Sequence, residues 1–116
     1  MFPDQKRLAA TVAQVDQLLH NGQFAELERL SGGQRFTAEQ IKTAIEAYPE
    51  ELAPRPAYDF EEGEIVQVRD RSPAEWSVYL HLWRKKGGRS DLTAELTVID
   101  TIAGLYRVQI DGIHAL

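Results

Sequence analysis

Hydrophobic and polar residues alternate with a period of two in two segments of the C-terminal half of the chain. Because successive side chains of a strand point to opposite faces of a sheet, this alternation predicts strands that bury one face. In residues 76–84 the apolar face consists of Trp76, Val78, Leu80 and Leu82. In residues 91–99 it consists of Leu92, Ala94, Leu96 and Val98. Gly87 and Gly88 supply the positive φ angles of a tight turn, so the two segments predict an antiparallel hairpin.

Two further strands are predicted next to this hairpin. Residues 105–110 alternate again, with Tyr106, Val108 and Ile110 on one face, and Gly112 is expected to break the strand. Residues 64–69 form the first predicted strand, and residues 70–73 turn the chain into the hairpin. The connections between these strands are too short for a crossover, so neighbouring strands are expected to be antiparallel.

Apolar residues recur with helical spacing in the N-terminal part of the chain, which predicts three helices. The first begins at Pro3 and stops at residues 21–22, an Asn-Gly pair; its stripe is Leu8, Val12, Val15, Leu18 and Leu19. The second is about two turns long, with Phe24, Leu27 and Leu30 on one face before a glycine pair at 32–33. Thr37 and Gln40 have the spacing of a capping box, and Pro49 ends the third helix at Tyr48.

Helices followed by strands predict an α+β fold. We expect three N-terminal helices packed on one face of a curved four-stranded antiparallel sheet. The length of 116 residues suits a single domain, 1–116, with a helical part over about 3–48 and a sheet part over about 58–116.

Composition narrows the function classes. The net charge of −5 argues against a nucleic-acid binder and favours a basic protein partner. No apolar run approaches the roughly 20 residues of a membrane span, so no membrane partner is expected. The first residues, MFPDQKRL, lack the regions of a secretory signal, so we expect a cytoplasmic protein.

Acidic residues cluster in the crossing segment, residues 50–64, between helices and sheet. Its carboxylates are Glu50, Glu51, Asp59, Glu61, Glu62 and Glu64, against Arg55 alone. A solvated loop can present such charges to a basic surface, and Glu61 and Glu62 are our candidates for partner binding. The alternative is that these residues only keep the chain soluble.

Candidate chemistry is sparse. None of the three histidines has a second ligand type at the spacing of a zinc site, and no nucleotide-binding or hydrolase motif occurs. Asp91, Thr93 and Glu95 share a predicted strand face, which places two carboxylates roughly 7 Å apart. We favour a solvated face on which Arg89 pairs with Asp91 or Glu95. We therefore expect no catalytic residue, no metal, no cofactor and no enzymatic activity.

Aromatic residues lie on the predicted face opposite the apolar one. Tyr79 and Trp83 form an exposed strip there unless the helices cover them, and such strips mark partner surfaces. His81 lies between them and, with Tyr79, is the candidate for lining a small-molecule pocket.

The segments WSVYLHLW, GRSDLTAELTV and VQIDGIHAL resemble an uncharacterised family of small bacterial proteins. Its members carry a W-S-V strand, a G-R-S-D-L-T-x-E-L hairpin arm and an I-H-x-L end. This resemblance marks Trp76, Arg89, Ser90, Asp91, Thr93, Glu95 and His114 as site or network candidates. The order of helices and strands is also similar to the NTF2-like and cystatin-like folds, which host enzymes, ligand binders and immunity proteins, so it implies no single activity.

Three function classes follow. We favour a protein-binding module, most sharply an immunity protein that neutralises a basic toxin domain. The alternatives are a small-molecule-binding or enzymatic NTF2-like domain with a pocket near Tyr79 and His81, and a structural domain whose uncovered sheet face forms a homodimer.

Overall fold

The computed structural model describes residues 3–33, 35–56, 60, 64–102 and 104–115. Three helices come first: α1 (Gln5–His20), α2 (Phe24–Ser31) and α3 (Ala38–Ala47). The strands follow: β1 (Leu52–Ala53), β2 (Ile65–Val68), β3 (Glu75–Arg84), β4 (Arg89–Ile99) and β5 (Arg107–Ala115). The predicted α+β class and the three helices are confirmed.

The helix ends follow from local hydrogen bonds. The Asp4 side chain accepts from the backbone N–H groups of Lys6 and Arg7, so Asp4 caps α1 at its N-terminus. The capping box predicted from Thr37 and Gln40 is present at the start of α3. α2 ends at Gly32, whose φ of 79° is a left-handed conformation that glycine adopts without strain.

The sheet is antiparallel and is built around β3. On one side β3 pairs with β4, which pairs with β5; on its other side it pairs with β2 through Glu75–Val78 and with β1 through residues 83–84. The sheet thus has five described strands instead of the predicted four, and β1 is the strand that was not predicted. β1 consists of only two residues, and so short a segment shows no alternation in the sequence.

The prediction that Gly112 ends the last strand was wrong. β5 continues to Ala115 because the strand accommodates an extra residue, Asp111, in a bulge between the pairs Leu96–Ile110 and Glu95–Gly112. A larger residue at position 112 would displace the side chain of His114, because a Cβ atom there would lie 2.6 Å from its Nε2.

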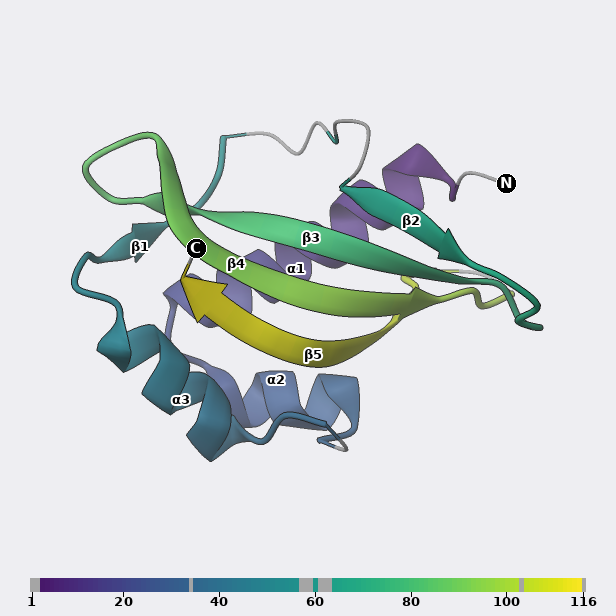
Figure 1. Cartoon of the computed structure of the whole chain (residues 1–116), viewed down its shortest axis with the longest axis horizontal. Helices are drawn as coiled ribbons and strands as arrows, with labels where there is room; N and C mark the ends of the chain where they lie inside the picture. The colour runs from purple at the N-terminus through teal and green to yellow at the C-terminus, as the bar shows by residue number, and fades with distance from the viewer. Residues whose placement is uncertain (1–2, 34, 57–59, 61–63, 103, 116) are drawn as a thin grey trace.

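One hydrophobic core joins the helices to one face of the sheet. Both predicted apolar faces are buried, with exposed fractions of 2% or less for all eight residues. The helices contribute Leu8, Val12, Val15, Leu19, Leu27 and Ile41. Figure 1 shows α1 passing behind the sheet and α2 and α3 lying below β5, so the opposite face of the sheet points toward the viewer.

Arg7 connects α1 to the β4–β5 connection through hydrogen bonds and a cation–π contact. Its guanidinium donates to the backbone oxygen of Gly104 (2.8 Å) and the hydroxyl of Thr101 (2.7 Å), and it lies 4.1 Å from the ring centroid of Tyr106. The Tyr106 hydroxyl in turn accepts from the backbone N–H of Asp4. These contacts span more than 90 positions of sequence, and no local pattern predicts them.

Candidate functional site

The sheet face opposite the helices carries most of the predicted site residues, and we call it the open face. Alternation along the strands places the following side chains on it: Val66 on β2, Ser77, Tyr79, His81 and Trp83 on β3, Thr93, Glu95 and Thr97 on β4, and Gln109 and His114 on β5. The register aligns His81, Thr93 and His114 across three strands, and it sets Tyr79 beside Glu95. Among the described residues no helix covers this face.

A buried carboxylate, that of Glu64, lies at the edge of the open face. The Glu64 side chain is 8% exposed, and its Oε1 lies 2.7 Å from the Arg89 guanidinium and 3.9 Å from Nε2 of His81. The expected pairing of Arg89 with Asp91 or Glu95 is therefore wrong. The cause is a register shift between His81 and Trp83, which places Arg89 opposite Trp83. A register shift cannot be recognised from alternation alone.

His81 also lies 3.1 Å, through Nδ1, from the hydroxyl of Thr93. The Thr93 hydroxyl, the His81 imidazole and the Glu64 carboxylate thus lie in a row, as in a catalytic arrangement of nucleophile, base and acid. However, Thr93 is only 4% exposed, and 3.9 Å from His81 to Glu64 is too long for a hydrogen bond. The geometry therefore fits a buried polar network better than a catalytic site.

The expectation that β4 has a wholly solvated outer face was wrong for its threonines. Thr93 and Thr97 are both buried, and the Thr97 hydroxyl lies 2.6 Å from a carboxylate oxygen of Asp111. The other oxygen of Asp111 lies 2.5 Å from the guanidinium of Arg35, in the α2–α3 connection. The bulge residue thus links the open face to the helices, a role that the sequence pattern did not indicate.

Glu95 and His114 form a second pair on the open face, 3.4 Å apart. Asp91 and Ser90, which the resemblance had grouped with them, lie elsewhere. Ser90 is buried and bonds locally to the backbone of Leu92. Asp91 lines a groove on the helix side, so it does not form an acid–base pair with Glu95.

Several carboxylates of the crossing segment form ion pairs with cations of the β3–β4 hairpin. The Glu50 carboxylate lies 3.6 Å from the guanidinium of Arg84, and the Glu51 carboxylate lies 3.1 Å from the ammonium group of Lys85, both at the β3–β4 hairpin. The Glu64 carboxylate forms an ion pair with Arg89. Asp59, Glu61 and Glu62 lie outside the described residues. The described half of this segment is thus engaged within the chain, and the expectation of partner binding rests on Glu61 and Glu62.

The aromatic strip is only partly exposed. Tyr79 is 37% exposed, whereas Trp83 is half-buried where it pairs with Ala53 of β1. Val66 on the neighbouring strand is 50% exposed and extends the apolar surface of the open face. Sequence reasoning did not select Val66, because a valine in a predicted strand is expected to be buried.

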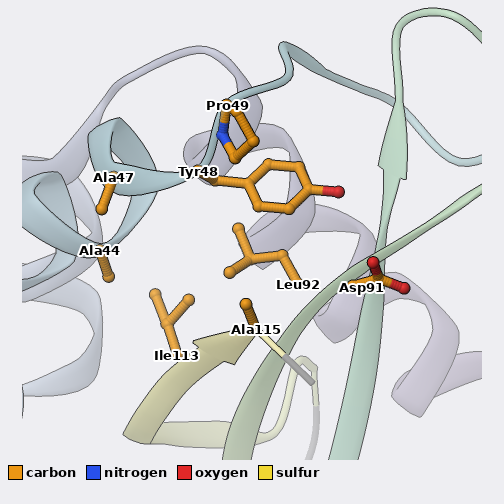
Figure 2. Close-up of a pocket in the computed structure, with 8 residues that line it drawn as sticks. All are labelled: Ala44, Ala47, Tyr48, Pro49, Asp91, Leu92, Ile113 and Ala115. Atoms are coloured by element: carbon orange, nitrogen blue, oxygen red, sulfur yellow. The ribbon is translucent and has the colours of Figure 1, made fainter.

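A groove of about 410 Å³ lies at the end of the sheet, between α3, the first residues of β4 and the last residues of β5. Figure 2 shows Ala44 and Ala47 on one side of the groove and the Asp91 carboxylate on the other, with Tyr48 and Pro49 above, Ile113 and Ala115 below and Leu92 between them. The groove does not include Tyr79 or His81, where a pocket was expected.

Within the described ranges, no cluster of three or more histidine, aspartate or glutamate side chains is arranged to hold a metal ion. Over the same ranges, every helix is too short or too polar to cross a membrane.

A family model with the description "Domain of unknown function (DUF7668)" matches residues 17–116. This agrees with the expected membership of an uncharacterised family. The match begins inside α1, yet the preceding turns of that helix bury Leu8, Val12 and Val15 in the core. Neither the curated proteins nor the solved structures give a significant match.

Proposed function

We propose that this chain, which belongs to the family described as a domain of unknown function, DUF7668, is a protein-binding module that docks a basic partner on its open face. The observation that carries the proposal is the asymmetry of the sheet. In the part of the chain that the structure describes, the helix layer covers one face and the other face exposes Tyr79 and Val66 at its surface. Exposed aromatic and aliphatic side chains on a rigid sheet are typical of the centre of a protein interface.

Charge supports a basic partner. The chain has a net charge of −5, and three of its carboxylates, those of Asp59, Glu61 and Glu62, lie within the five positions before Glu64 in the sequence. Glu64 lies at the edge of the open face, where it pairs with Arg89. Complementary charge mainly accelerates association, while the apolar centre supplies most of the affinity.

The sharper form of the proposal is that the partner is a toxin domain that this chain neutralises. A small acidic chain that presents one rigid surface is suited to covering a basic active site. The helices-then-sheet order also supports an NTF2-like or cystatin-like layout, in which a curved sheet presents such a surface. If the partner is a toxin, its expression alone should arrest growth, and co-expression of this chain should restore it.

The test uses the partner isolated on the immobilised parent chain. Tyr79→Lys and Val66→Lys should each raise the Kd at least about tenfold, the loss typical of a residue at the centre of an interface. Gln17→Lys places the same charge on the exposed side of α1 and should change the Kd less than about threefold. The proposal is wrong if Gln17→Lys weakens binding as much as the two open-face variants.

A further inference from the structure

A second surface of the molecule, whose lining does not include Tyr79, has an apolar trough along α3. The groove of Figure 2 adjoins a hollow of about 370 Å³ on the outward side of α3, and the two share Ala44 and Ala47. We call the groove and the hollow together the α3 trough. The hollow extends the surface to Phe36, near the N-terminal end of the helix.

Small side chains create this trough. Ala44 and Ala47 are three positions apart on α3 and therefore lie on one side of the helix. Larger residues wall the groove on both sides, Tyr48 and Pro49 above and Ile113 below (Figure 2). An alanine stripe between larger neighbours lets a second helix approach closely, because helix separation depends on the side chains at the contact.

The charges at the trough are of one sign. Asp91 lines the groove and Glu39 lines the adjoining hollow, and both are exposed. Among the described residues, no lysine, arginine or histidine lines either part, and Lys42, the single cation of α3, lies outside both linings. Within the described residues no cation is paired with either carboxylate, in contrast to Glu50, Glu51 and Glu64.

We propose that the α3 trough binds a basic amphipathic helix of a partner protein. The apolar stripe of that helix, with residues at i, i+3, i+4 and i+7, would pack on Ala44 and Ala47, and its lysines or arginines would reach Asp91 and Glu39. A second copy of this chain is a poorer occupant, because each copy has a net charge of −5. The site is separate from the open face, so either proposal can fail without the other.

The test is an NMR titration of the full chain with two synthetic amphipathic helices of about 15 residues. One carries leucine and lysine, and the other has glutamate at every lysine position. We expect saturable shifts at Ala44, Ala47 and Ile113 with the lysine peptide, and at least about tenfold weaker binding of the glutamate peptide. Equal affinity for both peptides, or shifts confined to the residues around Tyr79, would overturn the proposal.

Substitutions locate the site. Ala47→Trp fills the trough at an exposed position and should abolish binding, whereas Ala13→Trp, at an exposed alanine of α1, should leave it unchanged. Asp91→Asn should weaken the lysine peptide about two- to fivefold, with Asp70→Asn in the β2–β3 turn as its neutral control. If Ala47→Trp does not fold, the comparison of Asp91→Asn with Asp70→Asn decides, and equal effects of these two variants would exclude the trough.

Discussion

The pairing of Glu64 with Arg89 is predicted to stabilise the edge of the open face, and a double-mutant cycle measures its contribution. The pair has an unequal environment, because the Glu64 side chain is 8% exposed and the Arg89 side chain is 45% exposed. Breaking a fully buried pair costs about 3–5 kcal/mol, while an exposed pair contributes about 0.2–1 kcal/mol. We therefore expect Arg89→Met to lower the free energy of unfolding by about 2 kcal/mol, since it removes a cation that lies 2.7 Å from the buried Glu64 carboxylate.

The cycle combines Arg89→Met with Glu64→Gln. Glu64→Gln alters other contacts of Glu64 as well, so only the coupling energy reports the pair itself. We expect a coupling of about 1–2 kcal/mol, measured by urea unfolding with tryptophan fluorescence. Arg107→Met is the control, because Arg107 is exposed and has no ion pair within the described residues; it should cost less than about 0.5 kcal/mol. A coupling below about 0.3 kcal/mol would show that the register shift at Arg89 is not fixed by this pair.

Three other predictions follow from single positions. Leu80→Ala should lower the free energy of unfolding by about 2–5 kcal/mol, because the side chain is 1% exposed on the helix-covered face; a loss under about 0.5 kcal/mol in urea unfolding would invert the face assignment. Gly112→Ala should displace the ring of His114 and cost under about 1 kcal/mol, since that ring is half-exposed and can move; unchanged His114 ring signals in NMR would contradict it. Replacing both Glu61 and Glu62 by lysine should slow association with the isolated partner several-fold at low salt and less at high salt, because salt screens the attraction between charges. Identical association rates for the variant and the parent at about 20 mM and at 500 mM salt would exclude these residues from the interface.

The apolar faces of the sheet were predictable because one short-range rule determines them. Strands of nine residues or more, such as β3 and β4, repeat the alternation often enough to identify the face that the helices cover. The α3 capping box was predictable for the same reason, since Thr37 and Gln40 satisfy each other within one helical turn.

The site was less predictable because it depends on departures from regular pairing. The bulge at Asp111 keeps β5 paired beyond Gly112 and brings His114 to Glu95. The register shift before Trp83 separates Arg89 from Asp91 and turns it to Glu64, a residue 25 positions earlier. A glycine inside a strand often marks a bulge, so Gly112 was a local signal for the first irregularity, whereas the register shift before Trp83 leaves none. The sequence therefore identified the polar residues of the hairpin arm without identifying their partners.

The central claim, that a partner docks on the open face, is tested most directly by site-specific photo-crosslinking in cells in which the parent chain co-purifies with its partner. A benzophenone amino acid replaces Tyr79 in one variant and Ala13, exposed on α1, in another. The open-face account predicts one discrete adduct from position 79, of the mass of chain plus partner, and none from position 13. An adduct from position 13 together with none from position 79 would contradict it.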